Sequence, residues 1–366
     1  MQKIKIVQMS WSLSSGGAER FVVDLCNRLA CNSQLEIVLL TLADDKIPGN
    51  SHYLNKVSEK VRYLNLGCNS GTSLISHLKL LKLIHTEKPD IVHGHCGIQW
   101  LYLPSLVLKN ISFFYTLHIL AEVCLWHKSL KPVDRWFYTH KIQPITISKT
   151  CQRSYESLFG LQNAACITNG REPMVASKNR PTDVSFLADV DTPIFIHVAR
   201  CHKQKNQERL FSVFDKLQKE GMKFHLLVIG SGFEKQWMPL YENNTQIHIL
   251  GERKNVADYM ALADFFVLTS DFEGLPLTLL EAMSMGLIPI CTPAGGIVDV
   301  IQDGVNGFLT NKFDTDEFIA KVKEAVVKSH RISRDIIKDD YRKNYSMEVC
   351  ANKYYSLYLN KYGKQA

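Results

Sequence analysis

The chain has 366 residues, which at roughly 100 to 200 residues per domain predicts two domains, or at most three small ones. Hydrophobic residues make up 46% and charged residues 22%, so a disordered, collagen-like or low-complexity chain is excluded. The ten cysteines are scattered singly without a Cys-x-x-Cys pair, and the start of the chain has no long apolar stretch behind a basic leader. We therefore expect free thiols and a cytoplasmic location.

The net charge of +7 is concentrated in the first half of the chain. Residues 1–180 hold 21 Lys and Arg against 12 Asp and Glu, a net +9, and the remaining residues carry a net −2. A field of this sign favours an anionic partner, such as a phosphate-bearing acceptor or an anionic membrane surface. The alternative is that these lysines are ordinary solvated side chains. Nucleic acid is not expected, because the basic residues are mostly dispersed lysines without interleaved aromatics.

Strand and helix patterns alternate along the first half. We expect a loop at 12–20, helices at 21–30 and 73–88, and strands at 3–9, 34–42, 89–95, 111–118 and 144–148. Residues 97–126 are the most apolar segment, but Pro104 and the pair Lys109-Asn110 interrupt it before it reaches the roughly 20 residues of a transmembrane helix. Buried helix and strand are expected there, and partial insertion at a membrane interface is the alternative.

The same alternation returns in the second half. Helices are expected at 206–221, 256–263 and 277–286, and strands at 192–200, 223–230, 246–251, 264–270 and 287–292. The polar segment 177–193, with two prolines, has the composition of a linker. This pattern predicts an α/β protein with two Rossmann-like, doubly wound parallel sheets. We expect domains at 1–175 and 176–345, and a C-terminal helix at 346–366 that packs back on the N-terminal domain through Tyr354, Tyr355, Tyr358 and Tyr362.

The strongest functional pattern lies at 264–289. A buried strand leads into a loop at 270–274, Pro276 occupies the expected first position of a helix, and Gly286 is a natural stop for it. The helix N-terminus therefore lies at the carboxyl end of a parallel strand, where ligands bind in sheets of this kind. Glu273 comes just before the helix and Glu281 about a turn and a half inside it, so the two carboxylates can contact different parts of one elongated ligand.

This pattern resembles a known family. Glu273 and Glu281 enclose seven residues, as in the E-x7-E motif of glycosyltransferase family 4, the retaining, GT-B-fold sugar-nucleotide transferases, and EGLPLTLLEAM is similar to that family's EGFG-x3-LEAM. The resemblance covers nearly the whole chain in order, through PDIVHGH (89–95), YTLH (115–118), ITNGRE (167–172), VARCHKQKN (198–206), Gly295-Gly296 and DGVNGFL (303–309).

The resemblance implies two domains facing each other across a cleft, with the donor in the second domain and the acceptor in the first. It places Arg200 and Lys205 on the donor diphosphate, Glu281 on the ribose and Glu273 on the hydroxyls of the transferred sugar. Gly274 and Leu275, at the entrance to the helix, are expected to bind the donor through the backbone. Fixed cations on the diphosphate stabilise the negative charge that grows there in the transition state, so no metal and no cofactor are expected.

Two features of the first half complete the expected site. Gly16 and Gly17 lie between a strand and a helix, where glycines let backbone amides approach a phosphate, and the family's GGAE loop occupies this place. An ordinary tight turn is the alternative. His118 ends an apolar strand, where the family often has a histidine beside the transferred sugar, so a polar role near the reacting carbon is expected. A hydrogen-bonded structural histidine is the other interpretation.

Three other patterns are weaker. His93, His95 and Cys96 resemble a zinc cluster, but on a strand Cys96 points away from the two histidines. The D-x-D at 189–191 lies in the linker and is expected to be a solvated turn. Gly230-Ser231-Gly232, followed after 20 residues by Glu252, keeps an NAD-dependent oxidoreductase as an alternative.

The residues and the resemblance together predict a metal-independent, retaining glycosyltransferase. The donor is a nucleoside diphosphate sugar and the acceptor a glycan or a phosphate-linked lipid, in bacterial-type polysaccharide or lipid-linked glycan assembly. A peripheral position on the cytoplasmic face of a membrane would follow. A catalytically silent sugar-nucleotide binder is the competing interpretation, and the loop at 252–258, with Arg253, is a candidate for base contacts.

Overall fold

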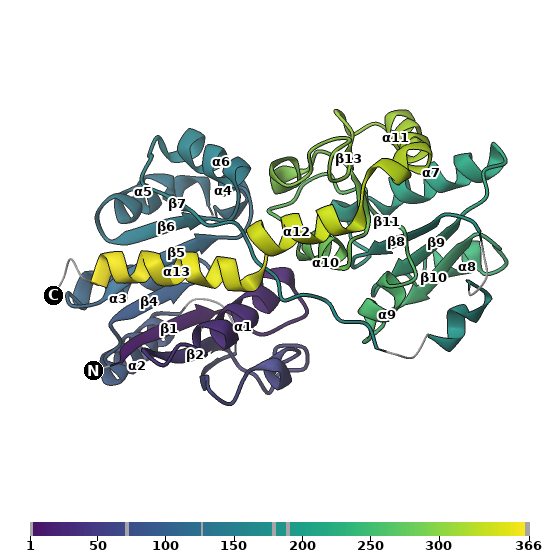
Figure 1. Ribbon diagram of the computed structural model, residues 1–366. Coiled ribbons are helices and arrows are strands. Elements are labelled where there is room, and N and C mark those ends of the chain that lie inside the picture. The colour runs from purple at the N-terminus through teal and green to yellow at the C-terminus, as the bar shows by residue number, and fades with distance from the viewer. Residues whose placement is uncertain (1–2, 70–72, 126, 178–180, 188–190, 363–366) are drawn as a thin grey trace. The chain divides into compact units, whose positions relative to one another are not determined.

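The computed structural model describes residues 3–69, 73–125, 127–177, 181–187 and 191–362. The chain divides into two compact units (Figure 1). The first unit comprises residues 1–171 and 345–366, and the second comprises residues 172–344. The first unit is therefore discontinuous in sequence, and the last segment of the chain completes it.

The first unit is built on a parallel seven-stranded sheet in the order β3-β2-β1-β4-β5-β6-β7. Val7 on the interior strand β1 pairs in register with Val38 on one side and Val92 on the other, and all three are fully buried. Near-continuous apolar strands of this kind are expected when helices cover both faces of a sheet. The strands are β1 (Ile4–Ser10), β2 (Leu35–Ala43), β3 (Arg62–Cys68), β4 (Ile91–Gly94), β5 (Ser112–Leu117), β6 (Ile142–Thr146) and β7 (Ala165–Cys166).

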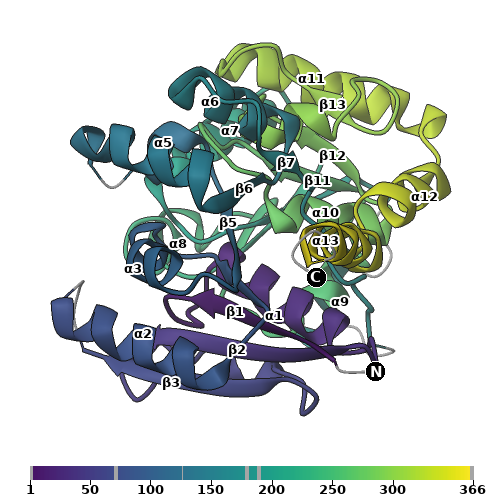
Figure 2. The ribbon, with the colours of Figure 1, turned by 90° about the vertical axis from the view of Figure 1, so that its left-hand side faces the viewer.

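Helices lie on both sides of this sheet. In Figure 2, α1 and α13 lie to one side of β5 and β6, and α3 and α5 lie to the other. The helices are α1 (Gly17–Leu29), α2 (Leu74–Glu87), α3 (Gln99–Val107), α4 (Ala121–Cys124), α5 (Lys131–His140), α6 (Lys149–Phe159) and α13 (Met347–Tyr362). The described part of the apolar segment, residues 97–125, contains α3, β5 and α4. The strand β5 is buried along its length, as expected, whereas Leu106 and Val107 of α3 and Val123 of α4 are exposed. None of the helices in the described part of the chain is both long and apolar enough to cross a bilayer.

The C-terminal helix packs on the first unit, which confirms the sequence-based expectation. The chain returns at Arg171, whose amide donates to the carbonyl of Tyr345 at 3.0 Å and whose carbonyl accepts from the amide of Met347 at 2.9 Å. Tyr354 and Tyr358 of α13 are fully buried. The side chain of Tyr362, also expected in this stripe, lies outside the described part.

The second unit is built on a parallel six-stranded sheet in the order β10-β9-β8-β11-β12-β13. Its strands are β8 (Ile194–Val198), β9 (His225–Ile229), β10 (Ile247–Gly251), β11 (Phe265–Leu268), β12 (Ile288–Cys291) and β13 (Phe308–Leu309). Its helices are α7 (Gln207–Lys219), α8 (Met238–Tyr241), α9 (Val256–Met260), α10 (Leu277–Met285), α11 (Thr315–Lys328) and α12 (Arg334–Asn344). The predicted class of two Rossmann-like parallel-sheet units is confirmed.

Both sheets have a point at which the strand order reverses. It lies between β1 and β4 in the first unit and between β8 and β11 in the second. The loops that follow two such strands diverge to opposite faces, which opens a crevice at the carboxyl edge where ligands bind in sheets of this type. Arg200 and Lys205 follow β8, and Glu273 follows β11, so the predicted residues of the second unit lie at its reversal point.

Candidate functional site

The second unit brings two of the predicted residues into direct contact. The Nζ atom of Lys205 lies 2.6 Å from Oε1 of Glu273, and the two side chains are 19% and 5% exposed. Lys205 ends a short 3₁₀ helix (Lys203–Lys205) after β8. Arg200 is exposed, and no described residue forms an ion pair or hydrogen bond with its guanidinium. The site therefore holds a shielded lysine–carboxylate pair and an accessible cation on the same loop.

Further polar residues, which the sequence analysis missed, tie the two loops together. The amide of Asp271 donates to the carbonyl of Gln204 at 2.9 Å, and Asn206 donates to both carboxylate oxygens of Asp271 at 3.0 Å. Asn206 adopts a left-handed conformation with φ of 48° and caps α7 by accepting from the amide of Arg209. Arg209 in turn donates to Asp271 at 2.8 Å. These bonds hold the loops after β8 and β11 in one arrangement.

The glycine pair at 295–296 holds the backbone of Glu273 in place. Gly295 has φ of +54°, and a Cβ atom there would lie 1.8 Å from the carbonyl oxygen of Glu273. The amide of Gly296 donates to the carbonyl of Gly274 at 2.6 Å. Only a residue without a side chain permits this approach, which accounts for the glycines at this point of the sequence pattern.

The helix that carries Glu281 begins at Leu277, as the pattern at 277–286 predicts, but Pro276 does not occupy the first helical position that was expected for it. Pro276 is the N-cap residue rather than the first helical residue, because its ψ of 125° is extended, and α10 starts at Leu277. Gly286 ends the helix with φ of +77°, as predicted. The side chain of Pro276 does not cap the first amides of α10. Glu281 is half-buried and Leu275 is 4% exposed.

In the first unit, the predicted glycines open α1. Gly16 is its N-cap residue and Gly17 its first residue. A Cβ atom on Gly16 would lie 2.0 Å from the carboxylate of Glu19, which accepts a hydrogen bond from the hydroxyl of Ser14 at 3.3 Å. The glycine at this position therefore leaves room for the side chain of Glu19. A phosphate contact of this loop stays a prediction.

His118 lies directly after β5, at the same edge of the sheet as the loop after β1. Its ring contacts Phe21 of α1 edge-on at a centroid distance of 5.4 Å, and its Nε2 atom is 2.9 Å from Nδ1 of His95. Burial lowers the pKa of His118 to about 4, so the ring is neutral at pH 7. A neutral imidazole offers one hydrogen-bond donor and one acceptor, which suits a polar contact with a sugar hydroxyl.

The alternative patterns gain no support from the geometry. His93 and His95 lie with ring centroids 4.1 Å apart, but among the described residues no three His, Cys, Asp or Glu side chains are arranged to hold a metal ion. Asp189 of the D-x-D lies outside the described residues. After Gly230-Ser231-Gly232 the next helix begins only at Met238 and has four residues, so the helix that a dinucleotide fingerprint requires does not open there.

Arg253, the candidate for base contacts, forms an ion pair, and its contact with a base stays a prediction. Its Nη2 atom lies 2.9 Å from Oδ2 of Asp183, and its Nε atom is 3.1 Å from the hydroxyl of Tyr259. Burial alone would raise the pKa of Asp183, but the hydrogen bonds that its carboxylate accepts from Arg253 and Tyr259 outweigh this and lower the pKa below its usual value. Arg253 thus anchors the short 3₁₀ helix at Thr182–Leu187.

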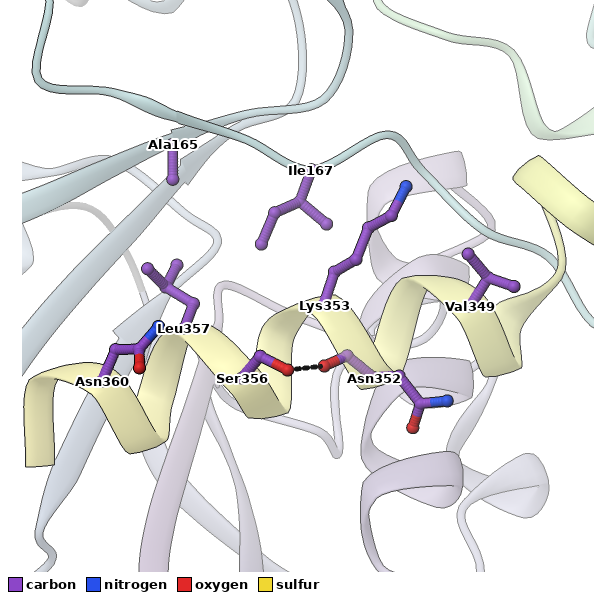
Figure 3. Close-up of a pocket in the computed structure, with 8 residues that line it drawn as sticks. All are labelled: Ala165, Ile167, Val349, Asn352, Lys353, Ser356, Leu357 and Asn360. Carbon is purple, nitrogen blue, oxygen red and sulfur yellow. Dashed lines mark hydrogen bonds between the residues drawn. The ribbon is translucent and has the colours of Figure 1, made fainter. Parts of the chain in front are cut away.

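A hollow of about 510 Å³ lies elsewhere, between β7 and α13 of the first unit (Figure 3). None of the predicted site residues lines it. Its polar lining is partly satisfied within α13, where the hydroxyl of Ser356 donates to the carbonyl of Asn352 at 2.9 Å. We place the candidate donor site at the reversal point of the second sheet, because Arg200, Lys205 and Glu273 follow the two strands there. The hollow is lined by Ala165, Ile167, Val349, Asn352, Lys353, Ser356, Leu357 and Asn360.

Two family models match this chain. Residues 180–343 match the family described as "Glycosyl transferases group 1", and residues 15–173 match "Glycosyltransferase Family 4". The chain is 34% identical over 286 residues to sulfoquinovosyl transferase SQD2 of Arabidopsis thaliana, with 72% of this chain and 55% of the relative covered. It is 30% identical to N-acetyl-alpha-D-glucosaminyl L-malate synthase of Bacillus anthracis, with 46% and 45% covered. The matched regions thus span about half of these two relatives.

The alignment with another relative spans nearly the whole of both chains at lower identity. The amylovoran biosynthesis glycosyltransferase AmsD of Erwinia amylovora is 23% identical, with 93% of this chain and 92% of the relative covered. Among solved structures, a glycosyltransferase from Rickettsia africae ESF-5 superposes with a TM-score of 0.82 at 17% identity, covering 98% and 99% of the two chains. Anabaena Alr3699/HepE in complex with UDP gives a TM-score of 0.77 at 17% identity, covering 97% and 99%. At this identity the structural similarity concerns the fold.

Proposed function

Because this chain belongs to the family 4, group 1 glycosyltransferases of GT-B fold, we propose that it transfers a sugar from a nucleoside diphosphate sugar to an acceptor hydroxyl with retention of anomeric configuration. The observation that carries the proposal is the convergence of Arg200, Lys205 and Glu273 at the reversal point of the second sheet. The complexes of Anabaena HepE with UDP and with UDP-glucose support a nucleotide-sugar donor.

The charges of the site suit the departure of a diphosphate. As the sugar leaves, it becomes oxocarbenium-like and negative charge grows on the diphosphate, so Arg200 and Lys205 stabilise the transition state more than the ground state. The donor phosphate replaces Glu273 as the partner of Lys205, and Glu273 then accepts hydrogen bonds from the transferred sugar. Glu281 binds the ribose, and the backbone of Gly274 and Leu275 contacts the donor. In this scheme neither a divalent ion nor a cofactor is needed.

The first unit is proposed to bind the acceptor. Gly16, Gly17 and His118 lie at one edge of its sheet, and His118 contacts the transferred sugar. The net positive charge of residues 1–180 favours a phosphate-linked lipid or a glycan as acceptor, in polysaccharide or lipid-linked glycan assembly. The polysaccharide relative AmsD supports this context.

We expect the alanine variant of Glu281 to bind donor nucleotide about 10- to 100-fold more weakly, because a hydrogen bond to a charged carboxylate is worth about 1.5 to 3 kcal/mol. Calorimetric titration of UDP, GDP and their sugars measures this, after a thermal-shift panel has identified the base. Glu242→Ala, an exposed carboxylate in the same unit, is the control. Equal affinities of the Glu281→Ala variant and the wild type would remove the ribose assignment.

The same panel distinguishes the competing functions. Slow hydrolysis of one nucleotide sugar by the wild type supports a transferase. Binding without hydrolysis or transfer to any acceptor supports a silent sugar-nucleotide binder. Stabilisation by NAD alone would support an oxidoreductase instead.

A peripheral position on the cytoplasmic face of a membrane is also proposed, through α2. Leu74, Ile75 and Leu78 of this helix are 74%, 67% and 50% exposed, and Lys79 and Lys82 are exposed as well. Exposed apolar side chains beside lysines suit insertion into the interface of an anionic bilayer.

Replacing Ile75 with aspartate is expected to lower co-sedimentation with anionic phospholipid vesicles, since it puts a charge among the inserted side chains. Val327→Asp in α11 is a matched control, because Val327 is 71% exposed and lies in the second unit. Wild-type binding should also weaken as salt rises. Binding that ignores anionic lipid and salt, or equal losses in both variants, would contradict the membrane proposal.

A further inference from the structure

A continuous row of hydrogen-bonded side chains connects the C-terminal helix with His118. The hydroxyl of Tyr358 lies 2.9 Å from Nε2 of Gln8, and Oε1 of Gln8 lies 2.8 Å from Nε2 of His95. Nδ1 of His95 is in turn 2.9 Å from Nε2 of His118. Tyr358 and Gln8 are fully buried and His95 is 8% exposed. Loss of these hydrogen-bond partners would therefore lower the stability of the protein.

The row has a branch at Tyr358. Its hydroxyl lies 2.6 Å from Nδ1 of His93, whose Nε2 is 2.8 Å from the hydroxyl of Thr116 on β5. Burial, and then the neighbouring histidines, lower the pKa of His93 and His95 well below the usual value. The histidines of the row are therefore neutral at pH 7. Each has one protonated ring nitrogen, which donates, and one unprotonated (bare) ring nitrogen, which accepts.

The orientation of the Gln8 amide gives the row a direction. Its Nε2 can only donate, so the hydroxyl of Tyr358 accepts a hydrogen bond from it. The same hydroxyl then donates its own hydrogen bond to Nδ1 of His93. Its Oε1 can only accept, so Nε2 of His95 carries a proton and Nδ1 of His95 is bare. Nδ1 of His95 then accepts from Nε2–H of His118, which leaves Nδ1 of His118 bare.

We propose that Tyr358 and Gln8 are positioning residues that fix the tautomer of His118, so that its Nδ1 accepts a hydrogen bond from a substrate hydroxyl. Within the described residues, Nδ1 of His118 has no hydrogen-bond partner. The inference rests on the proposed function where it gives His118 a substrate, whereas the tautomer is a property of the protein alone. The C-terminal helix would thus control a site residue through the hydrogen bonds of Gln8 and His95.

The tautomer can be measured directly in the full chain. Long-range ¹H–¹⁵N correlation spectra of protein labelled with ¹⁵N-histidine distinguish protonated from bare ring nitrogens, and His118→Ala identifies the signals of His118. We expect a protonated Nε2 and a bare Nδ1 in the wild type at pH 7.5. The opposite tautomer, or an exchanging mixture, would overturn the proposal without the need for a variant.

Replacing Tyr358 with phenylalanine removes the acceptor for Nε2 of Gln8. Rotation of the Gln8 amide then lowers the free energy, because Nε2 regains a partner by donating to His95. The carbonyl oxygen is left without a partner instead, and a buried carbonyl tolerates this better than a buried N–H does. We expect the His118 signals to shift to the opposite tautomer or a mixture. Tyr355→Phe, the same change in the same helix at a residue that bonds Gln34, should leave the signals unchanged. Gln8→Met provides a second test if Tyr358→Phe does not fold. An unchanged tautomer in a folded Tyr358→Phe or Gln8→Met variant would refute the proposal.

Kinetics separate this inference from the proposed function. Tyr358→Phe should lower kcat about three- to tenfold, the size of one neutral hydrogen bond, with the KM for the donor within roughly twofold of the wild type. Tyr355→Phe should match the wild type. If the spectra agree with the proposal but His118→Ala transfers sugar normally, the direction of the row stands and the catalytic placement of His118 is wrong.

Discussion

Replacing Lys205 with alanine is expected to lower kcat roughly 10²- to 10³-fold, as for the loss of a single electrostatic stabiliser in other enzymes. Lys205 lies 2.6 Å from Glu273 in the free protein. In the proposed transition state its ammonium group would instead neutralise the leaving diphosphate. The KM for the donor should change less, since the effect grows with the charge on the leaving group. Steady-state kinetics with the donor found in the binding panel measures both constants.

Two controls separate catalysis from stability. Lys203→Ala removes an exposed lysine from the same 3₁₀ helix and should leave kcat unchanged. Breaking a buried ion pair can cost about 3 to 5 kcal/mol of stability, whereas removal of both charges is often near neutral. The double variant Lys205→Met, Glu273→Gln should therefore recover stability but not turnover. Wild-type kcat in Lys205→Ala would remove Lys205 from the catalytic site.

Replacing Gly295 with alanine should both destabilise the protein and abolish transfer. The new Cβ would lie 1.8 Å from the carbonyl oxygen of Glu273, so the backbone at Glu273 must move, and the left-handed conformation alone costs about 1 to 2 kcal/mol. We expect the free energy of unfolding to fall by more than that amount. Denaturant titration measures the stability, and donor turnover measures the displacement of Glu273.

Gly304→Ala is a matched control for this variant. Gly304 also has positive φ, +74°, but a Cβ atom there meets no atom within 4 Å. It therefore carries the cost of the backbone conformation without the collision. If both variants lose equal stability and retain turnover, the contact between Gly295 and Glu273 does not hold the site.

The sequence predicts most of the second sheet because its strands are short, apolar and bounded by turn residues. It did not reveal β3 (Arg62–Cys68), since this edge strand is half-exposed and mostly lacks a buried apolar pattern. The strands β7 and β13 were also missed, because two residues carry no periodicity. Central strands are thus predictable from their apolar sequences, whereas the formation of edge strands depends on pairing with neighbouring strands.

The candidate site is predictable in its residues but not in its contacts. Glu273 and Lys205 are identifiable from their motifs, yet their ion pair joins residues 68 positions apart. It depends on the left-handed turn at Asn206 and on the close approach of Gly295, and neither can be derived from local patterns. The bond between Gln8 and Tyr358 spans 350 positions, so no pattern within one segment could indicate it.

The return of α13 to the first unit also bears on biosynthesis. The strand that contains Gln8 leaves the ribosome 350 residues before its partner Tyr358. Until then, the polar groups of Gln8 and His93 in the nascent sheet lack the hydroxyl that satisfies them in the finished protein. The amino-terminal unit can therefore reach its native hydrogen bonding only after translation has passed through the whole of the other unit.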